Sequence, residues 1–237
     1  MRHDVGLMGG MGSRFALGLA VTLAVFGTLV GAASAGTTIF ASADCCNYEP
    51  GPYVQDLGDL ATFDNTLSTA PHDVRANQLG PDGAPLFSSA VISGGGTSTV
   101  RGTQYLKAGT YPFFCIIHGA SMSGDLTIDG SKGTAVPRPS IRVSFVKQKL
   151  RQIRKSGVRV KVTAVTASTP VGIVASKGKT KIAVKSGLSL GAGKSRTLTL
   201  PLSKVGRKAI SKGKTVQIKL KATVPFGKPS TASRKVR

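Results

Sequence analysis

The residues best suited to chemistry lie in one short segment, residues 111–124, where Cys115, His118 and Met122 follow an apolar run. Another histidine, His72, stands upstream. The 237-residue chain has only three histidines, which excludes enzymes that bind metals through many imidazoles. A thiolate, two imidazoles and a weak thioether are the ligands of a trigonal copper site with a long axial Met. Copper is favoured over zinc because a thioether is a poor zinc ligand.

Each of these side chains also has a structural explanation. A cysteine within an apolar run is usually a core residue, a lone histidine is more often structural than a ligand, and Met122 could simply fill a gap in a core. Beyond Gly36, however, the chain has only His72 and His118, and both fall where ligands are expected. We therefore favour a copper site over a sandwich that holds no metal.

The segment resembles the copper loop of the cupredoxin family, which includes plastocyanin and azurin and has the pattern Cys, short spacer, His, variable spacer, Met. Residues 62–65 (Thr-Phe-Asp-Asn) and 71–74 (Pro-His-Asp-Val) resemble that family's first-ligand segment, and residues 109–115 resemble the strand that delivers the thiolate. The resemblance covers about residues 37–129. It implies a Greek-key β-sandwich that binds one type 1 (blue) copper per chain.

The resemblance also implies roles for the ligands. His72, Cys115 and His118 would be the equatorial ligands and Met122 the axial one, with His118 the more exposed. The family often has Asn after the first histidine and Ser or Thr after the thiolate, whereas this chain has Asp73 and Ile116. A His-Cys-His run is missing, which argues against a multicopper oxidase. The loop has a single cysteine, which argues against the binuclear copper centre of oxidase subunits.

The sequence predicts that short strands position these residues. Turn sequences separate the strands, such as Gly-Pro-Asp-Gly at 80–83 and Gly-Gly-Gly at 94–96. Strands at this spacing predict an all-β sandwich or barrel over residues 36–130. The expected strands are Thr37–Ala43, Pro52–Gln55, Leu60–Asp64, Val74–Gln78, Thr97–Arg101, Tyr111–Ile117 and Asp125–Ile128.

The charge distribution divides the chain in two. Residues 1–137 hold 6 Lys and Arg against 10 Asp and Glu, whereas residues 138–237 hold 26 Lys and Arg and no acidic residue. After a linker at 131–139, Val158–Val162 and Val216–Ala222 alternate apolar with polar or basic residues, which predicts a second, basic, Ig-like β-sandwich over 140–237. Residues 146–155 and 204–212 could be short helices.

The basic half has two explanations. Its charge could only keep the domain soluble, or it could bind an anionic cell-wall polymer or membrane surface. We favour the second because acids are absent over 100 residues. Nucleic acid is not an expected partner of an exported protein.

The first 35 residues are typical of a signal peptide. Arg14 precedes an uncharged run, Phe15–Ala35, that ends in Ala33-Ser34-Ala35. Cleavage would start the mature chain near Gly36 and place it outside the cytoplasm, in the periplasm, at the cell surface or secreted. The alternative is an uncleaved anchor, because the run is long enough to span a bilayer.

The adjacent cysteines Cys45 and Cys46 are harder to interpret. They could pair with each other, pair between molecules or bind a soft metal. We favour an incidental or intermolecular role.

These features together predict an exported carrier of single electrons between redox partners, not an enzyme. The alternatives are a copper scavenger or chaperone, and a surface-binding protein whose cupredoxin-like fold holds no metal.

Overall fold

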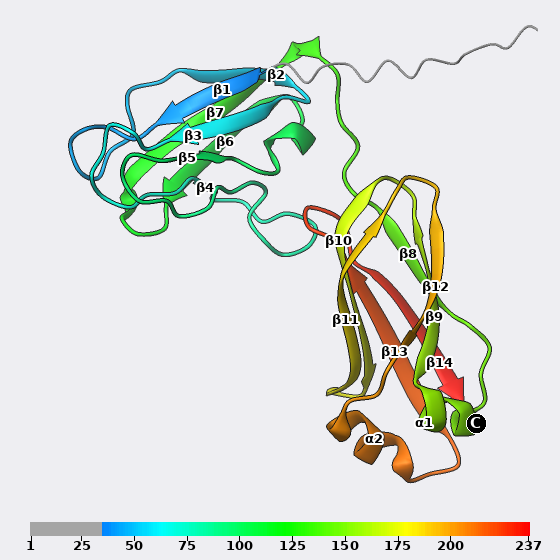
Figure 1. The fold of residues 1–237 in the computed structure, drawn as a ribbon. Coiled ribbons are helices and arrows are strands. Elements are labelled where there is room, and N and C mark those ends of the chain that lie inside the picture. The colour runs from blue at the N-terminus through cyan, green and yellow to red at the C-terminus, as the bar shows by residue number, and fades with distance from the viewer. Residues whose placement is uncertain (1–34) are drawn as a thin grey trace, which may run out of the picture. The chain divides into compact units, whose positions relative to one another are not determined.

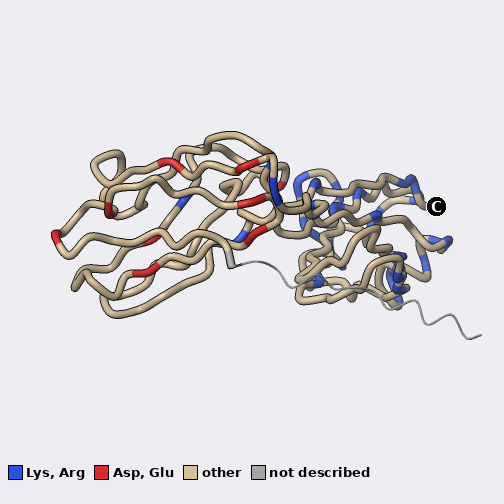
Figure 2. Tube along the Cα trace, turned by 90° about the horizontal axis from the view of Figure 1, so that it is seen from above, with Lys and Arg blue, Asp and Glu red and all other residues tan. Residues whose placement is uncertain are grey.

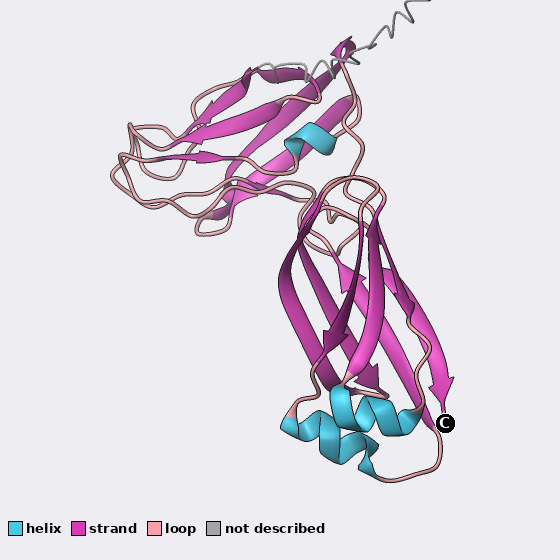
Figure 3. Cartoon of the chain, turned by 45° about the vertical axis from the view of Figure 1, so that its right-hand side comes forward, coloured by secondary structure: helices cyan, strands magenta, loops and turns pink. Residues whose placement is uncertain are grey.

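A computed structural model describes residues 35–237 (Figure 1). Within this range the chain forms mainly β-strands, with two short α-helices (Figure 3), so the all-β prediction is confirmed. The strands build two sandwiches, each with its own hydrophobic core. No helix between residues 35 and 237 is long and apolar enough to cross a membrane. Apart from its last residue, the predicted signal peptide lies outside the described residues.

The first sandwich consists of a three-stranded sheet in the order β1-β3-β5 and a four-stranded sheet in the order β2-β7-β6-β4. The pairs β1–β3 and β2–β7 are parallel, and the others are antiparallel. Every strand expected from the sequence overlaps an observed one. The strands are β1 (Ala35–Phe40), β2 (Tyr53–Leu57), β3 (Leu60–Asp64), β4 (Arg75–Ala76), β5 (Thr97–Thr99), β6 (Gly109–Cys115) and β7 (Gly119–Gly133), with a 3-10 turn at Thr103–Tyr105.

An aromatic cluster fills the space between these two sheets. The rings of Phe63, Phe87 and Phe113 are fully buried, and Tyr48 meets Phe113 edge-on at 5.0 Å between ring centroids. Side chains alternate along β6, so Phe113 and Cys115 both point into the core. The strand that ends at Cys115 is thereby anchored in the core of the sandwich.

The second sandwich has one sheet in the order β11-β10-β13-β14 and another in the order β12-β9-β8. Helix α2 begins after Ser203, whose Oγ accepts the Gly206 N–H at 2.9 Å as an N-cap. The elements are β8 (Ile141–Phe145), α1 (Leu150–Ser156), β9 (Val158–Ala164), β10 (Ser168–Lys177), β11 (Thr180–Leu190), β12 (Ser195–Leu200), α2 (Lys204–Ser211), β13 (Val216–Thr223) and β14 (Ser230–Val236).

The predicted alternation in the second sandwich is confirmed. Val158, Val160 and Val162 of β9 are fully buried, while Arg159 and Lys161 between them are exposed. Strand β13 repeats the pattern. Figure 2 shows acidic residues along the first sandwich and none along the second, where Lys and Arg are frequent. The charge break in the sequence thus falls between the last strand of the first sandwich and the first strand of the second.

Candidate metal centre

Three of the four predicted ligands meet in the first sandwich. One donor atom each from His72, Cys115 and His118 lies within 4.8 Å of the others. The Sγ of Cys115 is 3.8 Å from Nδ1 of His72 and 3.6 Å from Nδ1 of His118. His72 and Cys115 are fully buried and His118 is half-buried.

These separations fit a shared metal ion. With metal–nitrogen lengths of about 2.0–2.1 Å and a metal–sulfur length of about 2.3 Å, ligand angles between tetrahedral and trigonal place nitrogen and sulfur about 3.6–3.8 Å apart. Both observed separations fall in this range. The donor set of one thiol and two imidazoles suits copper or zinc among common ions.

Strand β6 and the turn after it position two of these donors. Cys115 is the last residue of β6, and His118 lies in the turn before β7. Gly119 has φ of 63°, a left-handed conformation that other residues rarely adopt, so glycine allows the chain to reverse there. Ser121 Oγ donates to the His118 carbonyl at 2.7 Å, which holds the turn closed.

The loop between β3 and β4 supplies the third donor. His72 pairs with Ile92 through two backbone hydrogen bonds of 3.0 and 2.9 Å. The buried Asn65 side chain donates to the carbonyls of Ala70 and Ile92, at 2.9 and 3.1 Å. Hydrogen bonds to Ile92 and from Asn65 therefore fix the backbone of the loop that carries His72.

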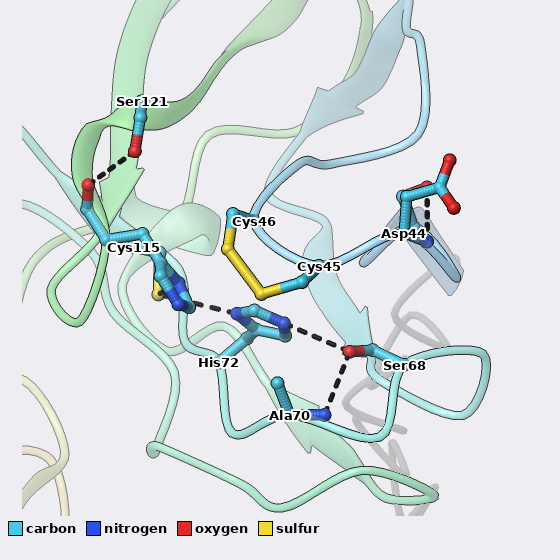
Figure 4. Close-up of a disulfide and its surroundings, with 10 residues drawn as sticks. Asp44, Cys45, Cys46, Ser68, Ala70, His72, Cys115 and Ser121 are labelled. Atoms are coloured by element: carbon cyan, nitrogen blue, oxygen red, sulfur yellow. Dashed lines mark hydrogen bonds between the residues drawn. A yellow bond between two sulfur atoms is a disulfide. The ribbon is translucent and has the colours of Figure 1, made fainter.

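Ser68 orients the ring of His72. Its Oγ accepts the Ala70 N–H at 3.1 Å and lies 3.1 Å from Nε2 of His72 (Figure 4). When Nε2–H donates to this hydroxyl, Nδ1 keeps its lone pair on the side of Cys115, as a metal ligand requires. Burial lowers the pKa of His72, and the nearby His118 lowers it further against an opposing effect of Asp73. The neutral imidazole, which is the form that binds metals, is thereby favoured.

Asp73 joins the two halves of the site. Its Oδ1 accepts the Ile116 N–H at 2.7 Å, and its Oδ2 lies 3.7 Å from Nε of Arg75. The buried Tyr48 hydroxyl donates to the Asp73 carbonyl. The Asp73 side chain thus links the loop that carries His72 to the residue that follows Cys115.

We expect Asp73→Ala to lower the free energy of unfolding of the first sandwich by about 1.5–3 kcal/mol, the usual contribution of a hydrogen bond to a charged group. Asp73→Asn should cost less, because the amide oxygen can still accept the Ile116 N–H. Urea denaturation can be followed by tyrosine fluorescence, since all four tyrosines lie between Tyr48 and Tyr111 and the chain has no Trp. Equal losses for the two variants would mean that the Ile116 contact does not stabilise the site.

Met122 is fully buried on β7, in the same core cluster as Cys115. Its role as a ligand stays a prediction. The orienting role of Ser68 was missed, because a serine four residues before a histidine has no distinguishing signal in the sequence.

The expectation that Cys45 and Cys46 pair between molecules was wrong. They form a disulfide with each other in the turn after β1 (Figure 4). Their sulfurs also group with a donor atom of His118 within 4.8 Å.

Comparisons with known proteins add fold likenesses only. No family model and no curated protein matches the chain. A reduced Cu(I) form of an amicyanin mutant is 19% identical, with 42% of this chain and 87% of that chain covered and a TM-score of 0.33. A purple cupredoxin from Nitrosopumilus maritimus is 20% identical, with 39% and 99% covered and a TM-score of 0.32. A DUF3823 family protein from Parabacteroides merdae is 13% identical, with 85% and 98% covered and a TM-score of 0.29.

Proposed function

We propose that this chain is an exported type 1 copper protein that carries single electrons between extracytoplasmic partners. The observation that carries the proposal is the convergence of two imidazole Nδ1 atoms on one buried thiol, at 3.8 and 3.6 Å. Copper bound there would supply a centre that alternates between Cu(I) and Cu(II). The resemblance of residues 37–129 to cupredoxins supports the same choice of metal.

The ligands differ in exposure, and this supports a carrier role. His72 and Cys115 are sealed in the core, so solvent does not reach them, while the half-buried His118 presents an edge to the surface. An electron would pass through this edge, and no bond in a partner would form or break. The rigid supports from Asn65, Ser68 and Asp73 would keep the same geometry in both oxidation states.

Voltammetry of the copper-loaded chain tests this function against the scavenger alternative. A carrier should give a reversible one-electron wave and keep its copper through repeated cycles. A scavenger or chaperone should release copper to a chelator in one oxidation state. Release on each cycle would overturn the carrier proposal and leave copper binding intact.

We expect Met122→Leu to retain copper and to raise the reduction potential. The buried thioether would be a weak donor to the oxidised metal, and its loss leaves three strong ligands in place. A swap between Met and Leu conserves volume and usually costs less than about 1.5 kcal/mol, so the fold should survive. An unchanged potential in voltammetry would show that Met122 only packs in the core.

The second sandwich supports a further part of the proposal, attachment to an anionic surface such as a membrane or wall polymer. Its basic residues alternate with buried ones, as with Lys219 and Lys221 on β13, so their charges face solvent. Attraction of this kind is screened over about 8 Å at physiological salt.

We therefore expect the chain to bind anionic vesicles at low salt and to release them as salt rises. Lys219→Gln with Lys221→Gln should weaken binding by about 2 kcal/mol if both face the surface, at about 1 kcal/mol per lysine. Co-sedimentation with anionic and neutral vesicles measures this, and an anionic wall polymer serves as the second probe. If neither probe is bound, or if binding does not change with salt concentration, the positive charge of the second sandwich serves only solubility.

A further inference from the structure

We propose that Cys45 and Cys46, once reduced to thiols, form with His118 a second metal site that captures Cu(I) and loads the buried site. The inference rests on the proposed function, because it assumes that copper is the metal of the buried site. It assigns a role to Cys45 and Cys46, which the proposed electron transfer does not use.

The geometry of the three residues indicates a second site at the solvent-facing edge of the buried site. The Cys45 sulfur, the Cys46 sulfur and a ring nitrogen of His118 lie within 4.8 Å of one another. Cys45 is exposed and the other two are half-buried, so an ion in solution can reach all three. The residues come from two separate segments, the turn after β1 and the turn after β6.

The donor types select the ion. Two thiolates and an imidazole are soft ligands that suit Cu(I). The disulfide form offers no thiolate, so the site depends on the redox state. A dithiol reductant would supply two electrons and two protons to the Cys45–Cys46 bond and become a disulfide itself. Cu(I) would then displace the thiol protons as it binds.

His118 belongs to both groups of donors, so the outer site formed by Cys45, Cys46 and His118 can pass an ion to the buried site. His72 and Cys115 are fully buried, so an ion that enters from solvent meets His118 before it meets them. An ion held by Cys45, Cys46 and His118 could exchange its two sulfurs for Cys115 and His72 while His118 stays close. Copper would thereby reach the core without being released to solvent.

A purely structural role explains the cysteine pair poorly. A disulfide stabilises a fold mainly by closing a loop in the unfolded chain, and the effect grows with loop length. Cys45 and Cys46 are adjacent, so their bond closes the shortest loop possible. Stabilisation of the fold therefore does not explain why the cysteine pair lies beside His118.

Counting bound Cu(I) tests the proposal. The purified chain is reduced with a dithiol, freed of it without oxygen, and titrated with Cu(I) against a chromophoric chelator. The reduced wild type should bind two equivalents, the second held by the thiolates of Cys45 and Cys46 once His118 serves the buried site, and the disulfide form should bind one. Cys45→Ser with Cys46→Ser should bind one under either condition. Asp44→Asn, an exposed change in the same turn that keeps both thiols, should behave as the wild type.

The loading role is tested by rate. Cu(I) is offered as its chelator complex, outer copper is removed after a set time, and the visible band of the buried site is read after oxidation. The reduced wild type should fill the buried site faster than the double serine variant. Equal rates would overturn the loading role, and a reduced wild type that binds one equivalent would overturn the outer site. A chain that binds no copper in the disulfide form would instead refute the proposed function.

Discussion

Cys115→Ala should abolish the intense visible absorption of the copper-loaded chain. That absorption requires a copper–sulfur bond, and Cys115 is the thiol on which both Nδ1 atoms converge, at 3.8 and 3.6 Å. The change removes a small buried side chain, so the apo protein should still fold. Absorption spectra of the variant and the wild type with one equivalent of Cu(II) measure the effect.

The double variant Cys45→Ser with Cys46→Ser is the matched control, because it removes the other two cysteines of the chain. It should keep the band, since in the absence of reductant these residues form a disulfide with each other. If the band persists in Cys115→Ala and disappears in the control, the copper is bound by Cys45 or Cys46, and the buried centre is refuted.

Phe113→Ala should cause a large loss of stability, about 3–5 kcal/mol in the free energy of unfolding. Its ring is fully buried and meets Tyr48 at 5.0 Å and Tyr53 at 6.0 Å between centroids. It also lies over Gly124 of β7, where an added Cβ would come within 2.8 Å of the ring.

Phe114→Ala is the control on the same strand. Its side chain is half-buried and points to the opposite face of the sheet from Phe113, so its loss should cost much less. Urea denaturation of the apo chain by tyrosine fluorescence reports on the first sandwich. Similar losses for the two variants would mean that the aromatic cluster does not hold β6 in place.

The strands were largely predictable from the sequence because their periodicity is local. The strand at Leu60–Asp64 has the bounds that its pattern predicted, and the alternating run at Val158–Val162 lies within β9. Strand β7 was expected only at Asp125–Ile128 but extends over Gly119–Gly133. Its hydrophilic ends carry no strand pattern and are ordered by pairing with β6 and β2 on its two sides.

The meeting of His72, Cys115 and His118 could be predicted for a different reason, since their types and order resemble a known ligand pattern. The contacts that orient them could not be. Ser68 and Ile92 contact His72 from separate positions in the chain, through a side-chain and a backbone hydrogen bond that depend on the folded loops. The disulfide between Cys45 and Cys46 was one of the alternatives that the sequence left open but not the favoured one, because a sequence does not show whether neighbouring cysteine side chains face each other.

Titration of the purified wild-type chain with Cu(II), without reductant, tests the central claim most directly. We predict an intense visible band that saturates at one equivalent, disappears on one-electron reduction and returns on reoxidation. A chain that binds no copper, or that binds it without an intense visible band, would contradict a copper centre built on the thiolate of Cys115.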